Sequence, residues 1–351
     1  MKKQPFKGID LSSDTSTQPT MAMKKAMLAA PLGDEQKRED PTTRKLEELT
    51  ADLLGQEDAL FLPSATMGNI IAIRLLCQPG DELIAAKQSH IIMAEGGGAA
   101  VHSGVLIKPI QTNTGLFTEQ DLHAAFRFEE SPRYPASTAV SVENTTNLGG
   151  GLAWKTETLQ AVLTKAKELK LKRHLDGARL CNAAIKMNVG IAELSQEFDT
   201  VTLCLSKGLG CPMGAVLAFK NNFSLQAERL KHLFGGAMRQ SGMTAAAGIY
   251  ALKNHIERLV EDHKHAEIFF KKLKSEIEEI RVEEHEASTN MVFFEWQGLH
   301  LSSDQFYQAC VNQGLRFSRT DHNRFRAVMH LGVSRKDVNL AAEVLKKVIK
   351  N

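Results

Sequence analysis

The chain of 351 residues lacks the features typical of secreted, membrane-spanning and nucleic-acid-binding proteins. Its five cysteines are odd in number and include no Cys-x-x-Cys, which argues for reduced thiols and against a disulfide framework or a zinc site. No apolar run is long enough to cross a bilayer, and the basic start at 1–5 is followed by no apolar segment that would act as a leader. The net charge is only +2, with acids and bases interleaved, so neither nucleic acid nor a membrane is an expected partner. We predict a cytoplasmic protein with no metal site.

The length and the 43% hydrophobic content allow one large and one smaller domain. Short apolar runs, most of them separated by helical patterns such as 118–127 and 156–170, predict an α/β fold with a mostly parallel seven-stranded sheet. The expected strands are 59–62, 82–85, 105–109, 139–142, 174–175, 201–205 and 215–219. The last two are too close for a helical crossover and are expected to be antiparallel.

Three parts of the chain are expected: an N-terminal arm (1–20), a large domain (21–250) and a small C-terminal α+β domain (251–351). Residues 9–20 are rich in hydroxyls and carboxylates, so we expect them to cap, turn or bind rather than enter a core. One helix is expected at 21–30 and one long helix from 242 to about 265. In the small domain, strands are expected at 291–295 and 326–330, and a last helix is capped by Ser334.

A lysine stands at the end of a core strand, where the apolar run 201–205 is followed by Ser206, Lys207 and Gly208. An ammonium at that place must be paired, neutralised, used covalently, or carried to solvent on its four-carbon stem. The segment Ser206-Lys207-Gly208 alone does not decide among these four alternatives.

Other strand ends also carry polar residues, and ligands of an open parallel sheet bind outside the carboxyl ends of its strands. Ser64, Ala65 and Thr66 form a small-residue turn that opens a helix, which suits a phosphate, although a simple serine cap has the same pattern. His90 and Glu95 follow the second strand beside three glycines.

The fourth and fifth strands end in acidic residues. Glu143 follows the fourth strand. Asp176 follows the fifth strand, and Arg179 comes three residues later. The two could form a buried ion pair, or they could be an anion and a cation that bind one ligand.

Asp176 and Lys207 on successive strand ends, with the turn near Ser64, match the chemistry of pyridoxal 5'-phosphate (PLP). A carboxylate keeps the pyridine nitrogen protonated, so that the ring can accept electrons from a bond broken at the substrate Cα. A lysine amine forms the Schiff base once its pKa is lowered from ~10.4.

With these residues in place, the chain resembles the low-specificity threonine aldolases, PLP enzymes of fold type I in the β-eliminating lyase group. The resemblance covers nearly the whole chain, and its pieces are specific as a set although each is weak alone. They are DLSSDT (10–15), EDPT (39–42), SATMGN (64–69), ENT (143–145) with Asn147, DGARLCNA (176–183), CLSKGLG (204–210), MRQ (238–240) and TN (289–290).

The resemblance implies a role for each matching residue. Lys207 would form the Schiff base, Asp176 would pair with the ring nitrogen, and His90 would stack on the ring. Ser64, Ala65 and Thr66 would hold the cofactor phosphate. Further cofactor contacts would come from Glu143, Arg179 and Ser206, and Arg239 would reach the cofactor of a neighbouring subunit. The substrate carboxylate would be bound by Ser13, Arg179 and Arg326, whose fork geometry suits a carboxylate. The resemblance also implies a homotetramer whose active sites lie at a dimer interface.

This chain departs from the family pattern at several positions. The family usually shows Tyr-Gly at Lys37-Arg38 and a histidine at Thr146. Threonine can form a hydrogen bond there but cannot act as a base near neutral pH. His232 stands where some relatives have lysine, and Ala65 and Ala237 replace glycines. These changes predict an intact cofactor site and altered substrate recognition.

The resemblance therefore implies aldol cleavage of a β-hydroxy-α-amino acid, such as L-allo-threonine or L-threonine, to glycine and an aldehyde. His90, Glu95 or a water held by Thr146 are the candidate bases. β-Elimination or racemisation of a small amino acid is the alternative, because the same electron sink serves each reaction. A PLP-binding protein without turnover is a third interpretation, against which the retained Lys207, Asp176 and Arg179 argue.

Overall fold

The computed structural model describes residues 6–129, 131–286 and 288–350, and the chain start at 1–5 lies outside them. The strands are β1 (Ile9–Leu11), β2 (Asp58–Leu62), β3 (Glu82–Ala86), β4 (Leu106–Ile110), β5 (Ser137–Glu143), β6 (Lys172–Gly177), β7 (Thr200–Cys204), β8 (Ala215–Phe219), β9 (Ile280–Val282), β10 (Met291–Trp296), β11 (Leu315–Arg319) and β12 (Arg324–Val328).

The helices are α1 (Met21–Leu28), α2 (Pro41–Leu54), α3 (Ala65–Leu76), α4 (His90–Met93), α5 (Gly98–Ser103), α6 (Glu119–Ala125), α7 (Thr156–Glu168), α8 (Leu180–Met187), α9 (Ser224–Leu233), α10 (Gly242–Asn254), α11 (Leu259–Glu276), α12 (Ser303–Asn312) and α13 (Arg335–Lys350). Ser334 caps α13 through Asp337, as expected.

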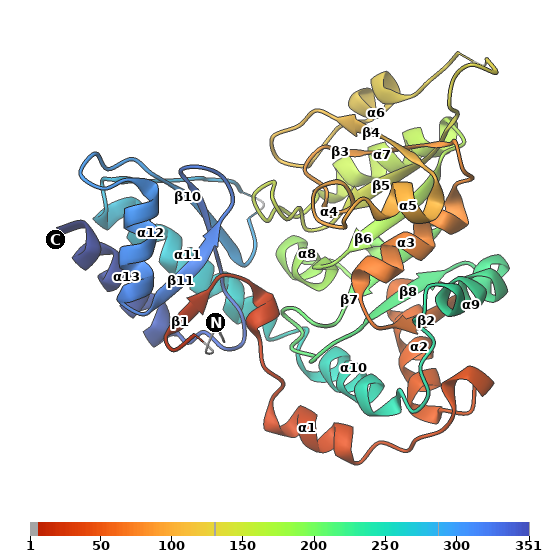
Figure 1. Ribbon diagram of the computed structural model, residues 1–351, viewed down its shortest axis with the longest axis horizontal. Helices are drawn as coiled ribbons and strands as arrows, with labels where there is room; N and C mark the ends of the chain where they lie inside the picture. Colours follow the sequence, from red (N-terminus) through yellow and green to blue (C-terminus); the bar gives the residue numbers. More distant parts are fainter. Residues whose placement is uncertain (1–5, 130, 287, 351) are drawn as a thin grey trace.

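The larger sheet has seven strands in the order β2-β8-β7-β6-β5-β3-β4. All neighbours pair in parallel except β8, which is antiparallel to β2 and β7, so the predicted sheet and the antiparallel last pair are confirmed. Alternate residues pack on opposite faces: Phe61 joins the core with α2, α7, α8 and α10, and Leu60 joins the core with α3 and α9. Both faces are therefore covered by helices, which explains the continuous apolar runs (Figure 1).

A second, five-stranded sheet forms the smaller part of the molecule, with the order β1-β11-β12-β10-β9. It packs with α11, α12 and α13 around a separate hydrophobic core, and it lies beside the larger sheet (Figure 1). Strands β9 and β11 were not predicted from the sequence. The boundaries at 20/21 and 250/251 stay a prediction.

Two expectations about secondary structure were wrong. The polar segment 9–20 does enter a core, because Ile9–Leu11 pairs in parallel with β11 and Leu11 is fully buried. The expected long helix from 242 to about 265 is two helices, α10 and α11. The break lies at His255, whose Nδ1 contacts the carbonyl of Leu209 at 2.7 Å and so ties the break to the turn after Lys207.

Candidate active site

Strands β5, β6 and β7 end next to one another, and each end contributes a predicted site residue. In the register of the sheet, Glu143 lies opposite Asp176 on the neighbouring strand. Strand β7 then leads to Ser206 and Lys207, where the chain turns with a hydrogen bond from Gly210 N to the carbonyl of Lys207 (2.8 Å). The carboxyl edge of the sheet therefore presents two acids and a partly exposed lysine together.

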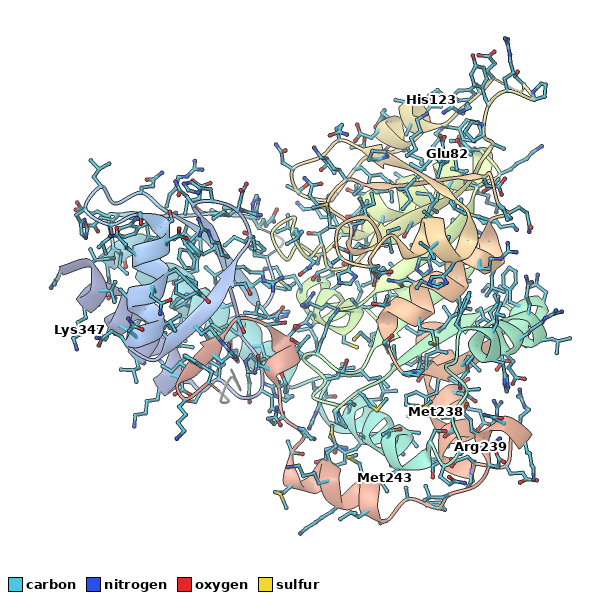
Figure 2. The ribbon with its side chains drawn as sticks, in the orientation of Figure 1. Glu82, His123, Met238, Arg239, Met243 and Lys347 are labelled. Atoms are coloured by element: carbon cyan, nitrogen blue, oxygen red, sulfur yellow. The ribbon has the colours of Figure 1, made fainter. Side chains whose placement is uncertain are left out.

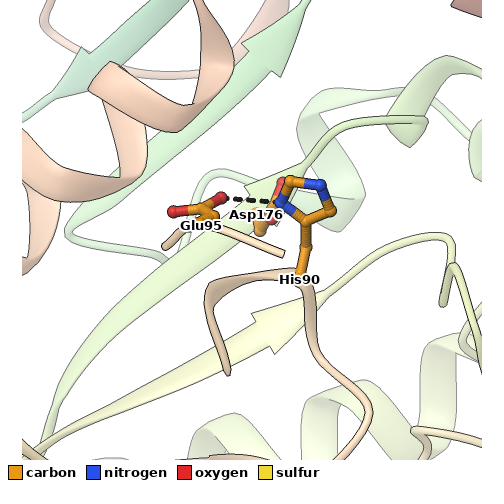
Figure 3. A group of neighbouring side chains, drawn as sticks. All are labelled: His90, Glu95 and Asp176. Atoms are coloured by element: carbon orange, nitrogen blue, oxygen red, sulfur yellow. Dashed lines mark hydrogen bonds and ion pairs between the residues drawn. The ribbon is translucent and has the colours of Figure 1, made fainter. Parts of the chain in front are cut away.

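His90, Glu95 and Asp176 form one compact group in which the ligating atoms lie within 4.8 Å of one another (Figure 3). The ring Nδ1 of His90 lies 2.8 Å from Glu95 Oε1, and this hydrogen bond raises the pKa of His90. Burial raises the pKa of Glu95, and the Asp176 carboxylate adds to the rise. Three such residues could also bind a metal, but Glu95 and Asp176 already accept hydrogen bonds from Asn69. The absence of a metal site stays a prediction.

Glu143 holds the backbone on both sides of this group. One of its carboxylate oxygens accepts a hydrogen bond from His90 N and the other accepts one from Asn147 N, each at 2.6 Å. Burial and then the Asp176 carboxylate raise the pKa of Glu143 to about 7. These two hydrogen bonds position His90 and Asn147, which the sequence had not indicated, and the predicted contact of Glu143 with the cofactor stays a prediction.

Two arginines lie beside this group and share one amide partner. Arg179 forms a two-point ion pair with Asp14, with Nε and NH2 each 2.7 Å from a carboxylate oxygen. Burial would raise the pKa of Asp14, but the Arg179 guanidinium outweighs it and holds the pKa well below its usual range. Asn147 Oδ1 accepts from Arg326 at 2.5 Å and from Arg179 at 3.5 Å. Asp14 and Asn147 are therefore site residues that sequence reasoning did not assign.

Arg326 differs from Arg179 because no carboxylate among the described residues pairs with it. Its remaining contact is a hydrogen bond from NH2 to the carbonyl of Ser12 (3.2 Å), and its buried Nε has no partner in the described part of the chain. Burial, followed by repulsion from Arg179, lowers the pKa of Arg326 to about 10. The Asp14 carboxylate offsets this only in part, and a buried guanidinium with no paired carboxylate is suited to an incoming one.

The turn after β2 has the predicted form of a phosphate site. Ser64 caps α3 by accepting a hydrogen bond from Met67 N at 3.2 Å, and Ala65 and Thr66 occupy the first turn, whose amides have no intrahelical acceptor. Helix α3 approaches the sheet closely at Gly68, where a Cβ would lie 2.9 Å from Thr202. A glycine there lets the helix N-terminus sit next to β7.

Thr146, Arg239 and Ser13 lie apart from the compact group. Thr146 is 1% exposed, and its hydroxyl accepts a hydrogen bond from Leu152 N. Arg239 is exposed on the segment before α10, next to Met238 and far from the small sheet (Figure 2), and it pairs with Asp34 at 2.9 Å. Ser13 caps the turn at Asp14–Ser16. A catalytic water on Thr146 stays a prediction.

Arg38 lies in a backbone conformation that usually favours glycine. Its φ is +59°, in the left-handed region that costs other residues about 1 kcal/mol. Its guanidinium pairs with Glu228, so this turn is connected to α9.

Replacing Thr146 by histidine, the usual residue of the family, should destabilise the protein. Thr146 is 1% exposed, and a Cβ at Gly115 would lie only 3.0 Å from its methyl group, so we expect a larger ring to be crowded. We expect a loss of about 1–3 kcal/mol in the free energy of unfolding, measured by urea denaturation. Thr146→Ser, which keeps the hydroxyl, is the control, and a Thr146→His protein as stable as the wild type would contradict the packing described here.

Comparison with known proteins decides the family. The family model described as beta-eliminating lyase matches residues 10–297. The chain belongs to the beta-eliminating lyase family. This lyase is 36% identical to low-specificity L-threonine aldolase 1 of Arabidopsis thaliana over 95% of the chain and 94% of the relative. It is also 36% identical to the low specificity L-threonine aldolase of Escherichia coli K12, over 94% and 96%.

Solved structures agree on the fold of this lyase. Leishmania major threonine aldolase superposes with a TM-score of 0.82 at 22% identity, covering 97% of this chain and 99% of that one. The fold type I architecture and the resemblance that the motifs indicated are confirmed. The chain is a PLP-dependent lyase.

Proposed function

We propose that this lyase cleaves a β-hydroxy-α-amino acid of the L-allo-threonine or L-threonine type into glycine and an aldehyde. The observation that supports this most is the connection, through Glu143 and Asn147, of the His90–Glu95–Asp176 group to Arg326, a buried guanidinium with no paired carboxylate among the described residues. The site thus combines an acid, a base and a carboxylate receptor.

The residues present fit PLP. Lys207 is partly exposed at a strand end and supplies an amine, Asp176 is buried and supplies an anion, and the first turn of α3 supplies free amides. When bound, PLP supplies an electron sink for the bond broken at the substrate Cα. Lys207 would hold the cofactor, Asp176 would face its ring nitrogen, and Ser64, Ala65 and Thr66 would hold its phosphate.

The chain's own residues would orient the substrate and move its proton. Arg326 binds the substrate carboxylate, with Ser13 and Arg179 beside it, and Asn147 fixes the spacing of the two guanidinium groups. His90 Nε2 is the atom that geometry favours as the base for the β-hydroxyl, because Nδ1 is already engaged by Glu95. Glu95 is the second candidate, because burial raises the pKa of its carboxylate and so makes it a stronger proton acceptor.

The test uses the PLP-loaded protein with L-allo-threonine, L-threonine and L-serine in separate reactions. We expect glycine and acetaldehyde from the first two. A keto acid and ammonia would instead show β-elimination, the D-isomer would show racemisation, and a PLP spectrum without any product would show a binding protein. Each of these outcomes overturns the aldolase proposal.

Arg326→Leu should weaken substrate binding without affecting the cofactor. The loss of a charge-assisted hydrogen bond pair is worth about 1.5–3 kcal/mol, so we expect KM for L-allo-threonine to rise about 10- to 150-fold. Arg324→Leu is the matched control, because Arg324 lies on the same strand but pairs with Glu283 at 2.5 Å. An unchanged KM, or a loss of PLP affinity instead, would contradict the assignment of the carboxylate site.

The oligomer and the compartment are part of the proposal. Family resemblance supports a homotetramer in which Arg239 reaches a neighbouring subunit's cofactor, and its exposed position fits that role (Figure 2). Light scattering coupled to size-exclusion chromatography measures the oligomer directly. The five cysteines are all free and buried, which supports a reducing cytoplasm. None of the helices in the described ranges could span a membrane.

A further inference from the structure

Asn69 on α3 is the residue that connects the two carboxylates of the active site. Its Nδ2 lies 2.7 Å from Glu95 Oε1 and 3.0 Å from Asp176 Oδ2, and the side chain is 1% exposed. Both contacts therefore use one amide nitrogen, which has a hydrogen for each carboxylate.

The orientation of this amide follows from its partners. An ionised carboxylate only accepts hydrogen bonds, so the carbonyl oxygen of Asn69 cannot face Asp176 and Glu95 without repulsion. In the buried site, a reversed amide would remove the Asn69 donor from both carboxylates, at a cost of about 1–3 kcal/mol for each. Something must therefore keep Oδ1 turned away from them.

His174 is the residue that contacts Asn69 Oδ1. It lies two residues before Asp176 on β6, so both side chains point to the sheet face that α3 covers. Its Nε2 is 3.2 Å from Asn69 Oδ1, and its Nδ1 is 2.9 Å from the hydroxyl of Thr200, its partner on β7. Burial lowers the pKa of His174 to about 4, so the ring is neutral near pH 7 and carries one hydrogen.

We propose that His174 is a positioning residue whose Nε2–H donates to Asn69 Oδ1 and thereby directs both amide hydrogens to Asp176 and Glu95. Asn69 Oδ1 can only accept, so it selects this tautomer, and the Thr200 hydroxyl, which can donate or accept, then donates to His174 Nδ1. His174 thus acts through Asn69 on the acid that faces the cofactor ring and on the acid that orients His90. The catalytic role inferred for His174 rests on the proposed function, whereas the hydrogen bonds of His174 and Asn69 do not depend on that function.

The first experiment determines the tautomer in the cofactor-free protein by ¹⁵N NMR of histidine-labelled samples. The His174 signals are assigned by their loss in His174→Gln. We expect Nε2 to carry the proton and Nδ1 to be unprotonated at pH 7. A proton on Nδ1, or a doubly protonated ring, would overturn the proposal.

The second experiment measures PLP affinity and the pH profile of the visible absorbance. His174→Phe keeps ring volume but has no donor, and we expect it to bind PLP about 10- to 100-fold more weakly. His174→Gln, whose amide nitrogen replaces Nε2, should restore most of that affinity, whereas a loss of packing alone would not be restored by a flexible amide. If His174→Phe does not fold, the PLP affinity of His174→Gln and the tautomer measured by NMR still test the proposal.

His263→Phe is the matched control. His263 Nε2 contacts Asn182 Oδ1 at 3.0 Å and burial likewise lowers its pKa to about 4, but this pair contacts neither Asp176 nor Glu95. We expect its PLP affinity and absorbance profile to equal those of the wild type. Wild-type PLP affinity in His174→Phe would overturn the proposal. If the wild-type protein bound no PLP, the proposed function would fail, and the NMR result would still decide the tautomer.

Discussion

Replacing Lys207 by alanine should abolish the visible absorbance of the PLP-loaded protein and lower turnover of L-allo-threonine by about 10³-fold or more. Lys207 follows a fully buried strand and is partly exposed in a turn closed by Gly210. Alanine fits that turn but leaves no amine to hold the cofactor. Absorbance spectra and an acetaldehyde assay measure the two effects.

Lys220→Ala is the control for this substitution. Lys220 also follows a strand of the same sheet, β8, but β8 is antiparallel to β7, so Lys220 lies at the opposite edge. Its Nζ donates to the carbonyl of Gln196, at 3.2 Å. The control should keep both absorbance and activity. A Lys207→Ala protein that still showed the absorbance of lysine-bound PLP would end the assignment of Lys207.

Asp176→Asn should have the second largest effect, a loss of about 10²- to 10⁴-fold in kcat. The Asp176 carboxylate accepts hydrogen bonds from Asn69 and from Ala178 N, which orient it without neutralising it. An amide of the same size keeps the packing but cannot hold a proton on the ring nitrogen through a negative charge. Single-turnover kinetics on the PLP-loaded variant separate this loss from any loss of cofactor.

Asp199→Asn is the matched substitution at the opposite edge of the sheet. Asp199 precedes β7 and pairs with Arg173 at 3.1 Å on the partly exposed surface, where such a pair contributes about 0–1 kcal/mol. We expect a small change in stability and a normal kcat. A normal kcat in Asp176→Asn as well would show that the carboxylate does not support the reaction.

The site has two halves that Glu143 joins. One half is the His90–Glu95–Asp176 group, and the other is the pair of arginines that share Asn147. Glu143 accepts the amide hydrogens of both His90 and Asn147, so one buried carboxylate connects the two halves. The departures from the family at Arg38 and Thr146 lie outside both halves, consistent with an intact cofactor site.

The sequence by itself determined the sheet edge and the residues gathered there. Apolar runs ending in Glu143, Asp176 and Lys207 placed all three at the same edge, because the carboxyl ends of parallel strands coincide. The cap at Ser64 was likewise visible, because a cap is a contact within three residues. Such signals depend only on residues that are close together in the sequence, so they can be identified without the tertiary structure.

Only the tertiary structure decided which polar groups are partners. Asp14 pairs with Arg179 from 165 residues away, β1 joins β11 from the other end of the chain, and His174 turns the amide of Asn69 across the interface of α3 with β6. The family resemblance implied two arginines at the substrate carboxylate, and in the described part of the fold Arg179 pairs with Asp14 whereas Arg326 pairs with no carboxylate. Periodicity and propensity act over a few residues, but the partner of a buried charge is selected by packing and desolvation across the whole fold.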